Sequence, residues 1–470
     1  MKKLLSILLI LSMLLSFAAC NPIPDPDNGS TDTDQGGNTE VVLDSFINGV
    51  NLEEYVIVYS ENAPDYNKRA AQYIADQIKE RAGLNLMINA DDLTERKYEI
   101  VVGETSRAIS AELDADTEDL EFAIYEKDGK IALEADYFVI AAAAYFFIET
   151  YVPNDGYEAT IPAGISIHAP IVREARNFIM LIGDGMGVNQ TLLFDYLEDT
   201  TDYSDGEDFF YGYMLPAHGF SMTNSLSGLT DSAAGGTALS TGYKTQNSHV
   251  GMLPDGTVLT SLTELAASLG MGTAVLSTEA QTGATPSAFS AHNVDRNNTD
   301  EIRESQFALS QNLGTIIECN FNYYTKKYMN NSIEKRVTDT LDKIDDKDAG
   351  FFLMYEEAHI DKHSHNGDME QTFNALIRFN QVIARYMEYA FYHPDTFILI
   401  TADHETGGLY ADTEGGELVY HTDTHTNVNV PIFAYGAGSE LFDGKTMENT
   451  EIPKIIASLM GIDNFGDQNS

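Results

Sequence analysis

Five apolar runs from residue 177 onward restrict the fold of the chain more than any other feature. They are NFIMLIGDGMG (177–187), GTAVLST (272–278), GFFLMYEEA (350–358), TFILITADHE (396–405) and VPIFAYG (430–436). Continuous apolar runs of this length are typical of strands that are buried on both faces of a sheet. The segments between them, most clearly 259–270 and 371–390, have the apolar spacing of helices. This alternation predicts an α/β three-layer sandwich with a mainly parallel central sheet over residues 171–470.

Carboxylates and histidines gather at the ends of these runs. They are Asp184, Glu356, Asp361, His365, Asp403, His404 and His425. Functional groups of a parallel sheet collect at the carboxyl ends of its strands, and the spacing of Asp361 and His365 places both on one face of a helix. Each residue alone is equally consistent with a helix cap or a hydrogen-bonded structural histidine. Together, a mixed set of nitrogen and oxygen ligands in one domain indicates zinc.

The stretch TDSAAGGTALSTG (230–242) surrounds one serine, Ser232, with very small side chains. Small residues allow a helix to pack tightly, so Ser232 could simply begin such a helix. The same residues would also leave room for a substrate beside a nucleophilic hydroxyl. These thirteen residues alone leave both interpretations open.

Residues 41–170 are expected to form a small α/β accessory domain. The pattern predicts strands at 54–60 and 98–103, helices at 67–83 and 137–152, and a hairpin over 121–135. The layout loosely resembles the α/β domain that precedes the catalytic barrel of some glycoside hydrolases. It contains no catalytic constellation, so an accessory role is expected, with carbohydrate or surface binding as the alternative.

The first twenty residues have the pattern of an export signal. Lys2 and Lys3 precede an apolar stretch, and two alanines then lead to Cys20, as in bacterial lipoprotein signals that carry lipid on this cysteine. Residues 21–40 are acidic and rich in Pro, Gly and Thr, which predicts a flexible linker. We therefore expect an exported protein, anchored by its lipid on the bacterial cell surface or in the periplasm. The only other cysteine, Cys319, is expected to be a buried apolar residue.

The charge of the chain restricts its partners. It has 27 basic and 73 acidic residues, and its formal net charge is −46. Nucleic acids and anionic membrane surfaces require a positive protein surface, so both are excluded as partners. An anionic substrate would need strong local positive charge from arginine or metal ions.

The catalytic half resembles the alkaline phosphatases in five separated motifs. They are DGMG (184–187), DSAAGGTAL (231–239), ATPSAFSAHNVDR (284–296), EEAHIDKHSH (356–365), and ADHETGG (402–408) with HTNVNVPIFAYG (425–436). The resemblance covers about 290 residues, and the motifs occur in the family's order. It implies hydrolysis of small-molecule phosphate monoesters through a phosphoserine intermediate, at a site with two Zn²⁺ and one Mg²⁺.

The resemblance also implies a role for each residue. Zinc ligands would be Asp361, His365 and His425 for one ion, and Asp184, Asp403, His404 and Ser232 for the other. Magnesium ligands would be Asp184, Thr285 and Glu356. Ser232 would be the nucleophile and Arg296 would bind the phosphate, with Asp231 orienting Arg296 and Lys362 assisting through water.

One position departs from the family pattern. Gly283 stands where the familiar bacterial enzymes have an aspartate that binds magnesium waters, which predicts a weaker or wetter magnesium site. The main alternative function is a phosphodiesterase or another member of the alkaline phosphatase superfamily, and the combination of Thr285, Glu356 and Arg296 favours the monoesterase. A sulfatase is disfavoured because its signature is missing. A lipoprotein that captures phosphate or metal without turnover is disfavoured by the presence of Ser232.

Overall fold

The computed structural model describes residues 45–113, 117–152, 154, 158–197, 209–319, 331–411 and 418–467. The predicted signal (1–20) and linker (21–40) lie outside these residues. None of the helices in the described ranges combines the length and the apolar character that crossing a membrane requires.

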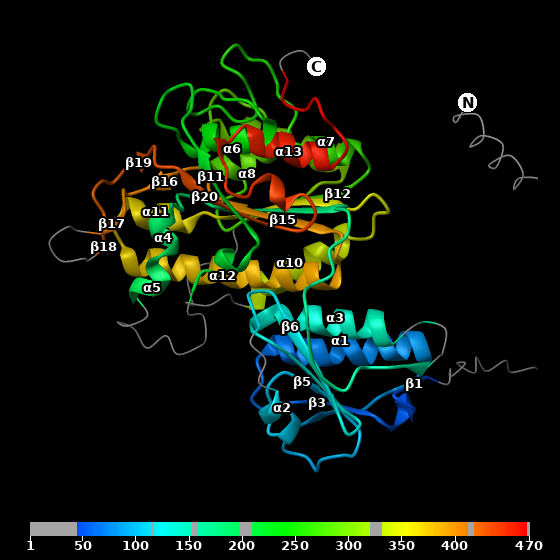
Figure 1. The fold of residues 1–470 in the computed structure, drawn as a ribbon. Helices are drawn as coiled ribbons and strands as arrows, with labels where there is room; N and C mark the ends of the chain where they lie inside the picture. The colour runs from blue at the N-terminus through cyan, green and yellow to red at the C-terminus, as the bar shows by residue number, and fades with distance from the viewer. Residues whose placement is uncertain are drawn as a thin grey trace, which may run out of the picture. The chain divides into compact units, whose positions relative to one another are not determined.

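An eight-stranded sheet organises the C-terminal part of the chain (Figure 1). Its strands, in spatial order, are β13 (Ile316–Glu318), β12 (Gly272–Ser277), β14 (Phe351–Glu357), β10 (Asn177–Gly183), β15 (Thr396–Thr401), β20 (Val430–Tyr435), β11 (Ala217–Met222) and β21 (Thr446–Glu448). The five apolar runs form β10, β12, β14, β15 and β20, and every residue of these strands is buried.

The direction of the strands confirms a mainly parallel sheet. The strands from β13 to β15 are parallel to their neighbours, whereas β20 is antiparallel to both β15 and β11. The amino end of β20 therefore lies at the same edge as the carboxyl ends of β10, β14 and β15. Cys319, which directly follows the edge strand β13, is free and only half-buried. The expectation of a buried cysteine was wrong, because an edge strand has a neighbour on one side only.

Helices cover both faces of this sheet. Alternate residues of β10 show the two layers, since Ile179 and Leu181 pack with α10 (Asn331–Ile344) and α12 (Met369–Tyr392). Phe178, Met180 and Ile182 pack on the opposite side, which is covered by α6 (Ser232–Thr241), α7 (Leu262–Ser268), α8 (Ala284–Ser290) and α13 (Glu451–Leu459). The predicted helices at 259–270 and 371–390 are thus α7 and α12, and the predicted three-layer sandwich is confirmed (Figure 1).

A second, six-stranded sheet lies in the N-terminal part. Its order is β4 (Ile88–Ala90), β3 (Val56–Tyr59), β5 (Glu99–Val102), β7 (Lys130–Ala135), β6 (Phe122–Lys127) and β9 (Gly164–His168). The first four strands are parallel, and β6 and β9 are antiparallel. Helices α1 (Asp65–Ala82) and α3 (Ile140–Tyr151) pack on one face, and α2 (Ala108–Glu112) packs on the other. The predicted strands, helices and hairpin are all present, and a separate domain over 41–170 stays a prediction.

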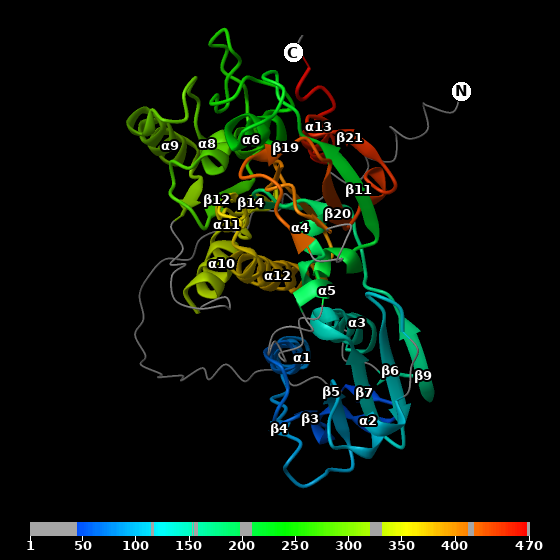
Figure 2. The ribbon, with the colours of Figure 1, turned by 90° about the vertical axis from the view of Figure 1, so that its left-hand side faces the viewer.

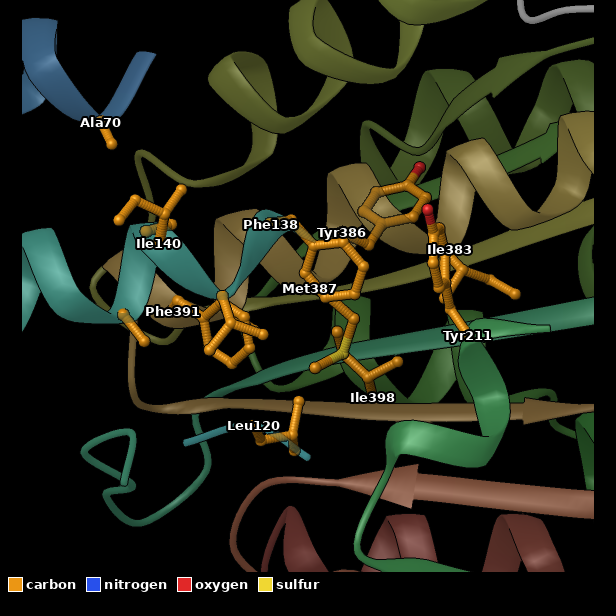
Figure 3. Close-up of a cluster of buried hydrophobic side chains, with 14 of the residues drawn as sticks. Ala70, Leu120, Phe138, Ile140, Tyr211, Ile383, Tyr386, Met387, Phe391 and Ile398 are labelled. Carbon is orange, nitrogen blue, oxygen red and sulfur yellow. The ribbon is translucent and has the colours of Figure 1, made fainter. Parts of the chain in front are cut away.

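Residues of both sheets and of α12 belong to one hydrophobic cluster (Figure 3). Helix α12 lies between the large sheet and the helices α1 and α3 (Figure 2). The ring of Phe138 lies 6.1 Å from that of Phe391 and 5.0 Å from that of Tyr211. Beside this cluster, Arg69 on α1 forms two hydrogen bonds of 2.7 Å with the buried carboxylate of Glu388 on α12. Apolar contact and a partly buried ion pair therefore join α1 and α3 to α12.

The remaining elements are short, apart from the 15-residue helix α9. They are β1 (Phe46–Ile47), β2 (Val50–Asn51), η1 (Leu52–Glu54), η2 (Tyr137–Val139), β8 (Glu158–Ala159), α4 (Val188–Thr191), α5 (Leu193–Leu197), η4 (Tyr211–Met214), α9 (Thr299–Leu313), α11 (His359–His365), β16 (Glu405–Thr406), β17 (Tyr410–Ala411), β18 (Leu418–Val419), β19 (His425–Thr426) and η5 (Ser439–Leu441).

Candidate active site

Two groups of metal-ligating side chains lie at the edge of the large sheet where most of its strands have their carboxyl ends. One consists of Asp361, His365 and His425, and the other of Asp184, Asp403 and His404. Within each group, one ligand atom from every residue lies within 4.8 Å of the others. These are the two sets that the sequence analysis assigned to zinc.

The strand order explains how the first group forms. Helix α11 directly follows β14 and presents Asp361 and His365 on one face, with Nε2 of the histidine 3.2 Å from Oδ1 of the aspartate. His425 lies on β19, which pairs with β16 immediately after His404. Because β20 is antiparallel, the residue that precedes it reaches the same edge as α11. Nε2 of His425 lies 3.1 Å from Nε2 of His365.

Ser232, the first residue of α6, lies beside the second group. Its Oγ is 3.2 Å from Nε2 of His404, and the ring of His425 stacks on that of His404 with 3.6 Å between centroids. The small residues after Ser232 permit close packing, since a Cβ on Gly235 would lie 2.9 Å from the carbonyl oxygen of Asp403. The small residues after Ser232 therefore allow α6 to pack tightly against the end of β15.

Asp231 caps α6 and positions Arg296. Its side chain accepts hydrogen bonds of 2.9 Å from the backbone N–H groups of Ala234 and Ser248. Its Oδ2 lies 3.5 Å from Nη1 of Arg296, whose backbone N–H also donates to the carbonyl of Ser248. Arg296 is therefore held at its backbone N–H and at its guanidinium group, next to the start of α6.

The residues predicted for magnesium also have free ligand atoms. Asp184 follows β10, Glu356 lies near the carboxyl end of β14, and Thr285 is on α8. Oδ1 of Asp184, Oε1 of Glu356 and Oγ1 of Thr285 are buried and have no hydrogen-bond partner. Three oxygens of the types that Mg²⁺ prefers are thus left available.

Glu279 is a site residue that the sequence analysis missed. A Cβ on Gly283 would lie 1.8 Å from Oε1 of Glu279, so this carboxylate fills the space beside the glycine. It accepts a 2.8 Å hydrogen bond from Nζ of Lys362, and its negative charge raises the pKa of Glu356. Two signals could have revealed it: Glu279 closely follows the carboxyl end of a buried strand, and it lies four residues before the departure at Gly283.

Electrostatics at the site favour cations. Burial and repulsion between neighbouring carboxylates raise the pKa of Asp184 and of Glu356 well above their usual range, and raise that of Asp403 to about 7. Burial and the neighbouring His425 lower the pKa of His404, so its imidazole is neutral and able to coordinate. Divalent cations would replace the protons and relieve the repulsion, so the donor atoms present fit metal ions.

A buried hydroxyl among such ligand groups, at this edge of a mainly parallel sheet, is typical of metal-binding hydrolases. The family model described as Alkaline phosphatase matches residues 175–324 and 317–422, which together make up more than half of the chain. The chain therefore belongs to the alkaline phosphatase family and is a phosphatase.

Individual relatives are distant and match only part of the chain. Alkaline phosphatase 4 of Bacillus subtilis is 25% identical over 337 residues, which are 60% of this chain and 71% of that protein. Alkaline phosphatase 3 of the same organism is 26% identical, and its match spans 52% of this chain and 63% of the relative. The structure of alkaline phosphatase from the Antarctic bacterium TAB5 covers 62% of this chain and 99% of its own, with a TM-score of 0.54 and 24% identity. This likeness shows that the fold is shared.

Proposed function

We propose that the protein hydrolyses phosphate monoesters to an alcohol and inorganic phosphate through a phosphoserine on Ser232. The observation that carries this proposal is the position of the Ser232 hydroxyl. It lies 3.2 Å from His404, a member of one group of metal-ligating side chains, and at the N-terminus of the ten-residue helix α6. A helix N-terminus favours a bound phosphate because its first N–H groups are unpaired.

The ligand sets support two zinc ions and one magnesium ion. Nitrogen and carboxylate donors in the two groups are typical of zinc, and the oxygens of Asp184, Thr285 and Glu356 are typical of magnesium. Glu279, whose carboxylate lies beside Gly283, would support these magnesium ligands. When bound, these cations would favour ionisation of the serine hydroxyl and neutralise charge on the phosphoryl oxygens.

The chain's own residues would carry out two displacements at phosphorus. In the first, Oγ of Ser232 attacks phosphorus, the bond to the alcohol oxygen breaks, and the alcohol leaves with a proton. In the second, water attacks the phosphoserine, the Oγ–phosphorus bond breaks, and Ser232 regains its proton as phosphate departs. Arg296 presents a planar fork to two phosphoryl oxygens. Asp231 keeps this fork in position, and Lys362 assists through water.

A phosphodiesterase is the competing function. The terminal phosphate of a monoester carries more negative charge than a diester, so it benefits more from a third cation site and from an arginine beside the serine. The unpaired buried oxygens of Thr285 and Glu356, together with the partly exposed Arg296, therefore favour the monoesterase.

The test compares p-nitrophenyl phosphate with bis-p-nitrophenyl phosphate, before and after treatment with a chelator. We expect faster turnover of the monoester, loss of activity with the chelator, and a loss of at least about a hundredfold in Ser232→Ala. Ser268→Ala, at an exposed position on α7, is the matched control and should keep full activity. Full activity of Ser232→Ala would disprove the serine mechanism, and faster diester turnover would favour the alternative.

We also propose that the chain is exported and anchored by lipid on Cys20, at the cell surface or in the periplasm. The basic residues, the apolar stretch and the small residues before this cysteine support the proposal. In cells that express the full chain, the mature protein should enter the detergent phase of a Triton X-114 separation. Cys20→Ala should abolish this partition, and an unchanged partition would contradict the anchor.

A further inference from the structure

A cavity of about 820 Å³ lies in the N-terminal part, at the carboxyl ends of four parallel strands. Its lining comes from residues 60–64, 66–67, 91–92, 103–106 and 134–137, which follow or end β3, β4, β5 and β7. The volume is within the range of small-molecule sites, roughly 300–1,000 Å³. All of these residues precede 175, where the alkaline phosphatase match begins. The cavity is therefore a feature of the part that the family does not explain.

The topology of the small sheet places a crevice at this position. From β3 the chain passes through α1 to β4 on one side, and it then enters β5 on the other side of β3. Helices α1 and α2, which follow β3 and β5, pack on opposite faces of the sheet. Ligands of open α/β sheets bind outside the carboxyl ends of the strands at such a switch point.

Asn67 supplies an unpaired polar group inside the cavity. It is only 7% exposed and lies in the first turn of α1. Its side-chain amide lines the cavity and makes no hydrogen bond to a described residue. The amide lies against Gly103, whose φ is +72° and where a Cβ would be 2.1 Å from Nδ2. The amide can therefore form hydrogen bonds with water or with a ligand in the cavity.

The charge of the lining selects the class of ligand. No lysine, arginine or histidine lines the cavity. Six carboxylate residues do, and they are Glu61, Asp91, Asp92, Glu104, Glu134 and Asp136. Asp91 is used internally, because its carboxylate accepts hydrogen bonds from the backbone N–H groups of Glu61 and Ser106. Phosphate and other anions are therefore excluded from this cavity.

Glu134 is the carboxylate that most needs a cationic partner. Its Oε2 is buried and has no hydrogen-bond partner. Burial, followed by repulsion from Glu104 and Asp136, raises the pKa of Glu134 to about 7. A positive charge placed among these three carboxylates would relieve both effects.

The spacing of the carboxylates argues against a bare metal ion. Among the described residues, three ligand atoms come within 4.8 Å of one another only in the two groups at the large sheet. The other polar lining groups are hydroxyls and amides, including the hydroxyls of Tyr66 and Tyr137. Tyr137 has a φ of +48°, a conformation that is rare for residues other than glycine and that is often found at ligand sites. An extended ligand that bears hydroxyl groups fits such a lining.

We propose that this cavity binds a small polyhydroxylated cation, of which a protonated amino sugar is the simplest example. Glu104, Glu134 and Asp136 would surround the ammonium group, while Asn67 and the tyrosine hydroxyls would bind hydroxyl groups of the ligand. The site does not depend on the proposed phosphatase reaction. The cavity side chains and the catalytic side chains can therefore be tested separately.

The test is titration calorimetry of the full chain with three probes. Triglucosamine carries both charge and hydroxyls, its N-acetylated trimer carries only hydroxyls, and spermidine carries only charge. We expect one site for triglucosamine and affinities at least about tenfold weaker for the other two probes. Equal binding of the neutral trimer or of spermidine would overturn the proposal, as would no binding of triglucosamine.

Single substitutions test whether triglucosamine binds in this cavity. Glu134→Gln conserves the shape of the side chain and should weaken triglucosamine about tenfold. Glu53→Gln, at an exposed position outside the cavity, is the matched control and should leave the affinity unchanged. Ser232→Ala should also bind normally, which separates this proposal from the catalytic one. Unchanged affinity in Glu134→Gln would place the probe elsewhere and refute the proposed site.

Discussion

Replacement of Glu279 by glutamine provides a direct test of the third cation site. The carboxylate of Glu279 lies beside Gly283, accepts a 2.8 Å hydrogen bond from Lys362 and interacts electrostatically with Glu356. Glutamine has the same shape and keeps an oxygen that can accept the bond from Lys362. The substitution therefore removes one negative charge and changes little else.

The expected effect depends on magnesium. Without the ion, the free energy of unfolding should change by less than about 1 kcal/mol, because the side chain of Lys362 is 42% exposed and such ion pairs contribute little. The substitution also removes the repulsion between Glu279 and Glu356, and this gain in stability partly offsets the loss of the ion pair with Lys362. With magnesium, loss of a carboxylate that supports the ligands should weaken binding about 10- to 100-fold, or roughly 1.4–2.8 kcal/mol. At saturating magnesium the stabilisation by the ion should fall by the same amount.

The assay is a magnesium titration of protein that has been stripped of metal and reloaded with zinc, followed by calorimetry and thermal unfolding. Glu451→Gln is the matched control, because it removes a carboxylate that lies 3.1 Å from Lys454 on α13. Gly283→Ala is a second route to the same effect, since its Cβ would displace the carboxylate of Glu279. If Glu279→Gln bound magnesium as tightly as the control, this carboxylate would have no part in the site.

Three predictions concern stability. Phe138→Ala should lower the free energy of unfolding by about 3–5 kcal/mol in denaturant titrations, because it empties the cluster between α3 and α12. Arg69→Met should cost about 1–3 kcal/mol by depriving the buried Glu388 of two hydrogen bonds, and adding Glu388→Gln should recover part of it. Burial lowers the pKa of His292, but the hydrogen bond and charge of Glu264 outweigh burial and raise it. The stabilisation by charged His292 is therefore complete below about pH 6.5 and is lost as the pH rises through the elevated pKa, so the difference in stability from His292→Gln should narrow as the pH rises above about 6.5.

The central strands could be predicted because their burial is visible in composition. Runs such as 397–400 are apolar at every position, which is a strong signal for a strand covered on both faces. The short edge strand β13 was not predicted, because three half-buried residues have no clear period. The antiparallel direction of β20 could not be predicted either, because it depends on the edge of the sheet from which the chain enters this strand.

The metal-ligating residues could be named because they lie at the ends of those strands in a recurrent order. Their partners were harder to identify. Glu279 is a neighbour of Glu356 only because Gly283 leaves space for its side chain, and that relationship exists in three dimensions alone. Likewise, Asn67 looks like an ordinary helix residue until the fold places it over Gly103 in a cavity.

The two acidic regions of this chain differ in how closely their oxygens converge, and this difference is the physical basis for assigning them different ligands. At the large sheet, ligand atoms of three residues lie within 4.8 Å of one another in two separate groups, a spacing that suits single divalent ions. In the N-terminal cavity, the carboxylates are dispersed over about 820 Å³ among amides and hydroxyls, so no single ion can reach them together. In a chain with a net charge of −46, both acidic sites need positive charge, but they need it from different kinds of cation. The first needs metal ions before it can attract a phosphate ester, and the second attracts an organic cation directly.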